Sequence, residues 1–142
     1  MTVRHGEYEI DDARDRFDVG RVYGWLATTY WSLDLTPGQF RRAVNGSSLS
    51  VGAYFGSEQV GCLRVVSDKT TFAWIADVFV TDSHRGQGLA RAMVRFSLRH
   101  PEHQGLRRWM LATRDAHGVY QPLGFQPLPA PTQMMIHRPR PN

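Results

Sequence analysis

A glycine-rich segment, Arg85-Gly86-Gln87-Gly88-Leu89-Ala90, is the clearest sign of chemistry in this chain. It follows an apolar, strand-like run and precedes an amphipathic, helix-like one. Such a junction presents unpaired backbone N–H groups and the positive end of a helix dipole to one point, and glycine lets the backbone approach a phosphate closely. The segment therefore predicts an anion site. Many strand-to-helix turns carry glycine for steric reasons alone, so the two glycines do not establish the site by themselves.

The glycine spacing excludes two familiar phosphate sites. No Gly-Lys-Ser/Thr is present to hold a nucleoside triphosphate with magnesium, and no Gly-x-Gly-x-x-Gly is followed by an acid at the distance typical of dinucleotide sites. No Cys/His cluster has the spacing of a zinc site, so no metal is expected.

The charge distribution also indicates an anionic ligand. Residues 1–84 carry eight basic and eleven acidic side chains, a net −3, whereas residues 85–142 carry nine basic and two acidic ones, a net +7. Nucleic acid and a polyphosphate cofactor are both candidate anions. The chain lacks a basic helix interleaved with aromatics, so no nucleic-acid partner is expected.

Three titratable residues near the loop are of interest. Asp77 is the one charged residue in an apolar strand, where burial would raise the pKa of a carboxylate toward the range useful for a general base. Hydrogen bonds to a neighbouring loop are an equally good explanation of Asp77. His117 is a weaker acid or base candidate, and His84, just before the loop, is expected to be solvated.

The N-terminal part should supply one strand and two helices. Glu7 to Ile10 is a strand candidate, and Asp18 can cap a helix that runs through Leu26. Thr36-Pro37-Gly38-Gln39 has the pattern of a capping box, which predicts a second helix to about Val44.

A sheet should follow. Leu49–Phe55 and Gln59–Val66 form a predicted antiparallel hairpin. Thr71–Val80 is the most apolar strand and is expected to be central and covered on both sides. Simple alternation of side chains predicts two faces for this strand. One face carries Phe72, Trp74, Ala76, Val78 and Val80, and the opposite face carries Ala73, Ile75 and Phe79.

The C-terminal part alternates helix and strand. Residues 88–100 have the apolar stripe of an amphipathic helix closed by Pro101, and residues 108–113 read as a buried strand. A short helix should carry Tyr120, and Phe125–Leu128 and Met134–His137 are predicted strands. The order indicates one mixed α/β domain over residues 1–142.

Length and composition agree with this class. A chain of 142 residues with 42% hydrophobic content can build one core. The single cysteine excludes an internal disulfide, and no apolar run is long enough for a signal peptide or a membrane span. A soluble, cytoplasmic protein is expected.

The loop resembles the acetyl-CoA signature of the GNAT acyltransferases, Gln/Arg-x-x-Gly-x-Gly/Ala, which Arg85, Gly88 and Ala90 match. A second GNAT signature, Tyr-x-x-x-Gly-Phe, is matched by Tyr120 to Phe125. The order and spacing of both signatures and of the flanking elements are similar over essentially the whole chain. The resemblance implies a GNAT fold: a mixed, mostly antiparallel sheet flanked by helices, with a parallel strand pair splayed at the cofactor site.

The resemblance also implies roles in holding acetyl-CoA as cosubstrate. The backbone of Val78, Phe79 and Val80 would pair with the pantetheine arm. The residues that would hold the pyrophosphate are Arg85, Gly86, Gln87, Gly88, Leu89, Ala90 and Arg91. Many members have an asparagine seven residues before the tyrosine; Thr113 stands there, and Asp115 is a candidate substitute or a cap of the short helix.

The implied reaction is direct acetyl transfer to a primary amine. Tyr120 would be the general acid that protonates the CoA thiolate, or alternatively a core tyrosine. Tyr30 and Trp31 lie in the region that walls the acceptor pocket, where they could contact substrate together with His117 or could anchor a helix connection.

Other readings stay open at this stage. A GNAT fold that binds acyl-CoA without turnover is one alternative. The acceptor, a small-molecule amine or a peptide amine, is undetermined, as are the acyl length and the oligomeric state, for which a homodimer is one option.

Overall fold

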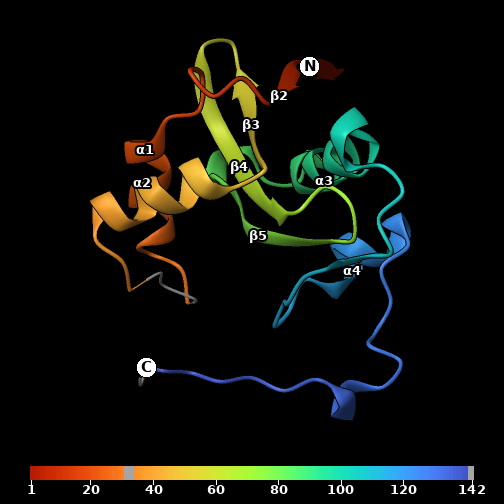
Figure 1. Cartoon of the computed structure of the whole chain (residues 1–142). Coiled ribbons are helices and arrows are strands. Elements are labelled where there is room, and N and C mark those ends of the chain that lie inside the picture. The colour runs from red at the N-terminus through yellow and green to blue at the C-terminus, as the bar shows by residue number, and fades with distance from the viewer. Residues whose placement is uncertain (31–33, 141–142) are drawn as a thin grey trace.

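The structure is a computed structural model that describes residues 1–30 and 34–140. Its centre is a six-stranded sheet in the order β1-β2-β3-β4-β5-β6 (Figure 1). The first five strands pair antiparallel and the last pair is parallel. The strands are β1 (Thr2–His5), β2 (Tyr8–Asp11), β3 (Leu49–Phe55), β4 (Glu58–Ser67), β5 (Phe72–Val80) and β6 (Arg108–Met110). The expected mixed, mostly antiparallel sheet is confirmed.

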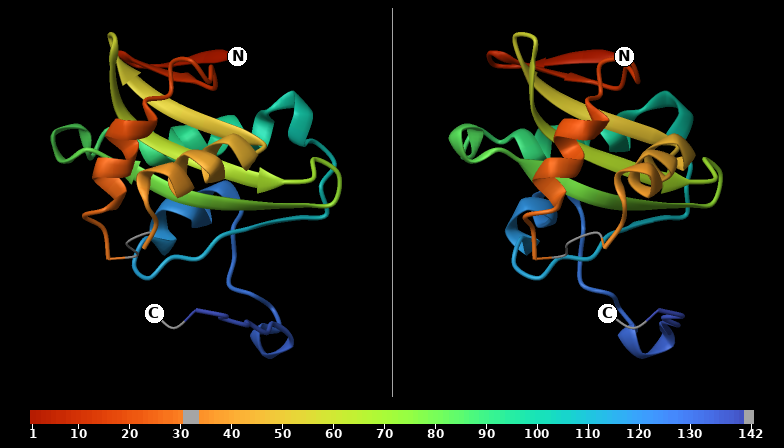
Figure 2. Two further views of the ribbon diagram at one scale, coloured as in Figure 1. Left: turned by 60° about the vertical axis from the view of Figure 1, so that its left-hand side comes forward. Right: turned by 90° about the vertical axis from the view of Figure 1, so that its left-hand side faces the viewer.

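Helices cover both faces of the sheet (Figure 2). α1 (Val19–Leu26) and α2 (Pro37–Gly46) lie on one face, and α3 (Leu89–Arg99) lies on the other. A one-turn helix, α4 (His117–Tyr120), follows β6. Short 3-10 turns occur at Asp82–His84, Pro101–His103, Gln121–Leu123 and Pro131–Gln133.

The predicted caps of the first two helices are confirmed. The Asp18 carboxylate accepts a hydrogen bond from the Arg21 N–H at 3.0 Å. At α2, the Gln39 N–H donates to the Thr36 hydroxyl at 3.2 Å, and the Gln39 side chain accepts from the Thr36 N–H at 2.9 Å. These bonds satisfy backbone donors that a helix start leaves free, so local sequence fixes both starts.

Strand β5 departs from simple alternation at Asp77, whose φ is +60°. Arg64 pairs with Ala76 and Cys62 pairs with Phe79, so β5 has one extra residue opposite β4. This bulge reverses the side-chain direction. Val78 and Val80 consequently join the α3-side core, and the predicted grouping of these valines with Phe72 and Trp74 is wrong.

The predicted strand over 108–113 is shorter and less buried than expected. β6 ends at Met110, its first residue is exposed, and its other two are half-buried. It pairs with β5 only through Phe72, Ala73 and Trp74. β5 is therefore next to the sheet edge and largely half-buried rather than fully covered on both sides.

The two predicted C-terminal strands are absent from the described residues. The chain over 126–140 forms an extended arm that stands away from the body (Figures 1 and 2). Pro127, Pro129 and Pro131 have no N–H to donate to a ladder, which disfavours strand pairing there. Conversely, the strand β1 was not predicted at all.

Among the described residues, no helix is long and apolar enough to cross a membrane.

Candidate active site

The glycine loop connects the Asp82–His84 turn to α3. Gly86 and Gly88 have φ values of +77° and +75°, a conformation that glycine adopts without strain. Gly88 is the N-cap of α3 and offers no side chain to the first helical N–H groups. These donors and the helix dipole therefore favour an anion in front of the loop.

The N-terminal hairpin holds this loop in place. His5 Nε2 lies 2.7 Å from the Gln87 carbonyl oxygen, and because a carbonyl can only accept, the imidazole donates. The Tyr8 hydroxyl shares a hydrogen bond of 2.9 Å with His84 Nδ1. The His84 ring also packs against Tyr8 and Phe55. His84 is thus half-buried, and the expectation that it is solvated is wrong.

The hydrogen bonds of His5 and Tyr8 to the loop region were not predicted from the sequence, because β1 was not predicted. The signal that could have found them is the Gly6-Glu7 turn between two short stretches of alternating residues.

Two arginines border the loop. Arg85 Nε donates to the Val80 carbonyl at 3.1 Å, and its Nη1 forms an ion pair of 2.8 Å with Asp82. Arg91 Nη2 donates to the Gly118 carbonyl at 3.4 Å. Both side chains are exposed, so each can meet an anion at the mouth of the loop.

The C-terminal end of β5 borders an open notch. β6 stops pairing with β5 at Trp74, so among the described residues Phe79 and Val80 have a ladder partner only on β4, and Val78, in the bulge, has none. The predicted splay of the parallel pair is confirmed. The free side of this strand end can accept an extended ligand as an added strand.

Tyr120 is the last residue of α4 and belongs to the core cluster against which Val78 and Val80 pack. It is 8% exposed, packs in the α3-side core and meets Phe125 edge-on with ring centroids 6.0 Å apart. Burial, with a smaller effect of Tyr30, raises the pKa of Tyr120 above its ordinary value. The phenol therefore carries its proton throughout the neutral range.

Asp77 is not an isolated acid. Its Oδ2 accepts a 2.5 Å hydrogen bond from Arg64 Nε, and both side chains are largely buried. Arg64 Nη1 also donates to the Ser47 hydroxyl at the end of α2. The partner of Asp77 is thus an arginine on the adjacent strand, not the neighbouring loop proposed as the alternative.

Tyr30 contacts the loop that leads from β6 to α4. The Arg114 guanidinium lies 3.7 Å from the Tyr30 ring centroid, and the Tyr30 hydroxyl accepts from the Arg114 N–H at 3.2 Å. Trp31 lies outside the described residues.

Asp115 and His117 are both exposed. Asp115 does not cap α4, because the Ala116 N–H at the helix start donates to the Thr113 hydroxyl at 3.0 Å.

A hollow of about 940 Å³ lies between β6, α4 and the C-terminal arm. His117 and Tyr120 line it together with Leu111 and Thr113, so two of the predicted site residues share one cavity. Within residues 1–30 and 34–140, no group of three or more His, Cys, Asp or Glu side chains is placed to bind a metal ion.

Comparisons with known proteins agree with this geometry. The sequence pattern of the Acetyltransferase (GNAT) family matches residues 10–125. A crystal structure from Xanthomonas campestris pv. campestris, assigned to the acetyltransferases of the GNAT family, superposes with a TM-score of 0.89 and 36% identity over 95% of each chain. A Deinococcus radiodurans R1 structure assigned as an acetyltransferase covers 97% of this chain and 94% of its own at TM-score 0.73 and 22% identity, which indicates a shared fold.

A curated Gibberella zeae protein assigned as an acetyltransferase is 39% identical over 61 residues. That match spans 41% of this chain and 33% of the fungal protein.

Proposed function

The chain belongs to the GNAT acetyltransferase family, and we propose that it transfers an acetyl group from acetyl-CoA directly to a primary amine, with Tyr120 as the general acid. The observation that carries the proposal is that β5 and β6 part beyond Trp74, which among the described residues leaves the end of β5 without a strand partner on that side, directly before the glycine loop at the start of α3. The buried Tyr120 belongs to the core cluster against which Val78 and Val80 pack.

The loop and the notch suit the two halves of a CoA molecule. Gly86 and Gly88 have positive φ values and no side chains, so the backbone is accessible where a pyrophosphate would approach. Leu89, Ala90 and Arg91 would offer first-turn N–H groups, and Arg85 would add charge. The edge of Val78 to Val80 would hold the pantetheine amides by backbone hydrogen bonds.

The chemistry then needs two proton movements. A neutral amine attacks the thioester carbonyl, the C–N bond forms, and the C–S bond breaks. The nitrogen loses a proton to a base, and the sulfur leaves as a thiolate that takes the proton of the Tyr120 hydroxyl. The raised pKa of Tyr120 supports this role, because it keeps the donor protonated at neutral pH.

Asp77 is the candidate base within the same proposal, acting directly or through a water path. Its buried ion pair with Arg64 also gives Asp77 a structural function, because removing one partner leaves the other charge buried and uncompensated. Replacing Asp77 by Asn should therefore lower both the melting temperature and the rate. A variant that loses stability but keeps the low-pH limb of the rate profile would assign the base to water.

The acceptor is a small-molecule amine or a peptide amine, and Tyr30, Trp31 and His117 are the proposed contacts. Tyr30 suits this task because its ring, stacked under Arg114, is 52% exposed. Asp115, exposed beside Arg114, is a proposed polar contact to the cofactor arm. We place the reaction in the cytoplasm, where the single cysteine, Cys62, stays a buried free thiol.

Two measurements test the function in sequence. CoA should raise the melting temperature, because a ligand that binds only the native state adds RT ln(1 + [L]/Kd) to its stability. A flat thermal-shift titration up to millimolar CoA would refute cofactor binding. A screen of amines for acetyl-CoA-dependent thiol release would then identify the acceptor, whereas CoA binding without turnover on any amine would support the non-catalytic alternative.

A further inference from the structure

Arg114 is held in place without the use of its side-chain hydrogen-bond donors. Its guanidinium carbon lies 3.7 Å from the Tyr30 ring centroid, and its backbone N–H donates to the Tyr30 hydroxyl at 3.2 Å. A guanidinium that stacks on a ring uses its flat face, whereas its N–H groups point outward in its own plane. Tyr30 therefore orients the Arg114 side chain and leaves its donors available to a ligand.

The protein itself supplies no close acceptor for these donors. Among residues 1–30 and 34–140, the one ion pair of Arg114 joins its Nη2 to Asp115 Oδ2 at 4.0 Å, which is too long for a hydrogen bond. Both side chains are exposed, so such a pair contributes little. By contrast, Arg16, Arg64 and Arg85 each form an ion pair of 2.8 Å or shorter. Arg114 is thus ordered as those arginines are, but it lacks a partner of comparable quality.

Arg114 stands at the edge of the proposed reaction site. Thr113 before it and His117 after it line the hollow of about 940 Å³ that Tyr120 also lines. The loop from β6 to α4, which carries Arg114, meets the chain that follows α1 (Figure 2). Burial raises the pKa of Tyr120, and Tyr30 adds to this effect, so the two phenols lie close enough to interact. The stacked side chains of Tyr30 and Arg114 therefore border the space where an amine would approach the thioester.

A cation at this position discriminates between amines. Residues 85–142 carry nine basic and two acidic side chains, and the acidic ones are Glu102 and Asp115. Glu102 is already paired with Lys69 at 3.0 Å. A plain ammonium ion would therefore be repelled near Arg114, whereas an amine that brings its own anion would be attracted. The cofactor does not account for Arg114, because its pyrophosphate is assigned to the start of α3.

We propose that Arg114 determines acceptor specificity by binding a carboxylate of the acceptor, so that the substrate is an amine that also carries a carboxylate group, as amino acids do. The planar fork of a guanidinium matches the two oxygens of a carboxylate and can donate to both. This inference rests on the proposed acetyl transfer for the role of the amine, but binding of the carboxylate is measurable without turnover.

Matched pairs of amines provide the test. Each pair consists of a carboxylate and its carboxamide, which has nearly the same shape and no charge: glycine with glycinamide, β-alanine with β-alaninamide, and 4-aminobutyrate with 4-aminobutanamide. The pairs differ in the distance between the amine and the carboxylate. In the best pair, kcat/KM of the wild type should be about 10- to 100-fold higher for the carboxylate than for the amide. Rates are compared per unprotonated amine, because the amide group lowers the pKa of a nearby amine.

Variants of Arg114 and Tyr30 identify the group responsible. Arg114→Gln removes the charge and should bring the carboxylate-to-amide ratio to within about threefold of one, chiefly by raising KM for the carboxylate. Arg114→Lys keeps the charge without the planar fork and should retain part of the ratio. Tyr30→Leu removes the ring that orients the guanidinium and should lower the ratio about threefold, whereas Tyr30→Phe should lower it less. Arg41→Gln, an equal loss of charge at an exposed position of α2, should keep the wild-type ratio. Thermal unfolding checks that each variant folds.

Calorimetric binding of the same amines to CoA-saturated protein gives a second measurement that does not depend on turnover. The best carboxylate should bind the wild type at least about tenfold more tightly than it binds Arg114→Gln. Carboxylate binding through Arg114 without acetylation of any amine would support this inference and count against the proposed acetyl transfer.

Three results would overturn the inference. The first is equal behaviour of carboxylates and amides in both measurements, and the second is a preference for carboxylates that Arg114→Gln leaves unchanged. The third is tighter binding of phosphoethanolamine than of every carboxylate, because the site would then suit a phosphate.

Discussion

Tyr120 and Asp77 show how the same fold gives two acidic side chains different properties. Tyr120 is buried among apolar groups and has Phe125 at its ring edge, so nothing in its first contacts stabilises a phenolate. Asp77 sits at a bulge, where its carboxylate accepts a hydrogen bond from the Arg64 guanidinium. At this scale, the phenol is surrounded by apolar groups, whereas the carboxylate has an ion-pair partner on the adjacent strand.

Replacing Tyr120 by Phe removes one proton donor and retains the packing ring. Turnover should fall by about 10²-fold, at the low end of general acid effects because a thiolate leaves readily, while KM for acetyl-CoA changes little. The wild-type rate should also decline at alkaline pH as the phenol ionises, and the variant should lack this limb. Steady-state rates across pH, with the amine found by the screen, check both effects.

Phe125→Leu is the matched control, since it disturbs the same aromatic contact and leaves the hydroxyl in place. It should keep the alkaline limb. If Tyr120→Phe has wild-type turnover and an unchanged profile, Tyr120 is a core residue and the proton comes from His117 or solvent.

Among the elements, the start of α3 is the one that most directly determines cofactor binding. Its N-cap, Gly88, lies in the left-handed region, and a Cβ there would be 3.4 Å from His5 Nε2. The loop conformation thus depends on its glycines, and β1, some eighty residues earlier in the sequence, holds the loop through His5.

Gly88→Asp should abolish measurable CoA binding while the fold survives. The reason is electrostatic, because the carboxylate would stand where the pyrophosphate charge is bound. Gly88→Asn has the same shape and a similar tolerance of positive φ without the charge, so it should bind CoA more weakly than wild type but far better than Gly88→Asp. Calorimetric titration measures all three proteins, and equal affinities for Asp and Asn variants would show that the anion binds elsewhere.

His5→Ala tests the anchor of the loop. Losing one hydrogen bond to the Gln87 carbonyl should destabilise the binding conformation of the loop by about 1 kcal/mol, which corresponds to roughly fivefold weaker CoA binding. His5→Gln can still donate an N–H and should recover part of the affinity. Val3→Ala, at an exposed position of β1, serves as control. Affinity unchanged in His5→Ala would limit this contact to a packing role.

The elements also show where sequence patterns suffice. The caps at Asp18 and Thr36 and the helix after Gly88 follow from local chemistry, and the structure confirms them. The loop and the strand before it were likewise predictable, because a motif of fixed spacing identifies them. The bulge at Asp77 was not, since an extra residue in a strand depends on pairing with β4.

Contacts between distant segments were equally hidden. The bonds of His5 to Gln87 and of Tyr8 to His84 join residues about eighty positions apart, and no local pattern encodes them. The prediction of the two C-terminal strands was wrong because local strand propensity alone does not make a strand. Met134–His137 has strand propensity, but a strand needs a partner, and the prolines before it hold it away from its own sheet.

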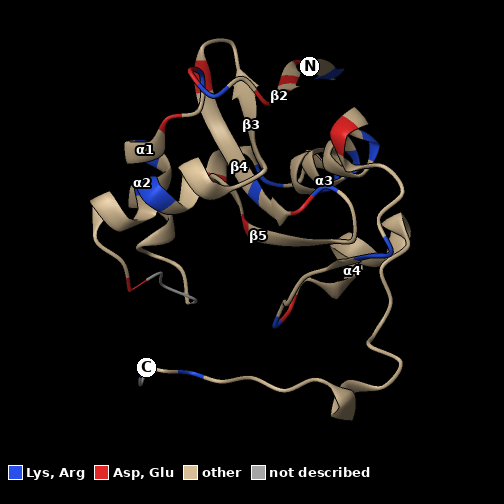
Figure 3. Ribbon diagram, viewed as in Figure 1, with Lys and Arg blue, Asp and Glu red and all other residues tan. Residues whose placement is uncertain are grey.

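The basic charge of the C-terminal half lies on α3, at β6, before α4 and on the arm (Figure 3). Arg91, Arg95 and Arg99 are four residues apart on α3 and therefore share one face of that helix. Arg85 and Arg91 lie in and directly after the glycine loop, where their charge favours an anion.

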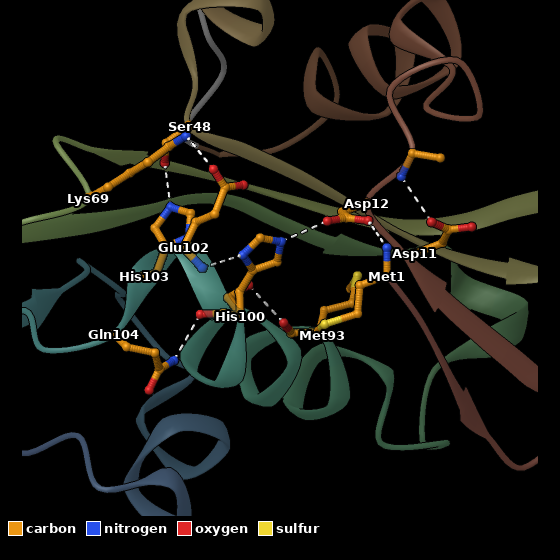
Figure 4. A network of polar contacts seen from close by, with 12 residues as sticks. Met1, Asp11, Asp12, Ser48, Lys69, Met93, His100, Glu102, His103 and Gln104 are labelled. Atoms are coloured by element: carbon orange, nitrogen blue, oxygen red, sulfur yellow. Dashed lines mark hydrogen bonds and ion pairs between the residues drawn. The ribbon is translucent and has the colours of Figure 1, made fainter.

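A polar network ties the N-terminus to the end of α3 (Figure 4). The Asp12 carboxylate receives hydrogen bonds from the N-terminal ammonium at 2.9 Å and from His100 Nε2 at 2.8 Å. Burial alone would raise the pKa of Asp12, but these partners outweigh it and the pKa is lowered. His103, beside His100, is 1% exposed and bonds Ser48 through Nε2 at 2.8 Å.

The surroundings of His103 disfavour its charged form. Ser48 Oγ lies 3.1 Å from the Val65 carbonyl oxygen and 2.8 Å from His103 Nε2. His103 Nδ1 is buried and has no hydrogen-bond partner among the described residues. Burial, followed by the nearby charges of His100 and Lys69 and opposed by Glu102, lowers the pKa of His103 below 6.5.

This lowered pKa predicts an acid-sensitive fold. Below pH 6.5 the unfolded chain binds a proton at His103 before the folded chain does, so the free energy of unfolding should fall as the pH drops from neutral toward the folded pKa. The Asp12 contribution is lost only below about pH 4, since its pKa is lowered from an ordinary carboxylate value.

Urea denaturation at a series of pH values between these limits should show the loss in the wild type. His103→Gln keeps a donor for Ser48 and cannot ionise, so its unfolding free energy should fall less over the same interval, whereas the exposed His117→Gln control should follow the wild type. Equal slopes for His103→Gln and the wild type would place the acid sensitivity at another histidine.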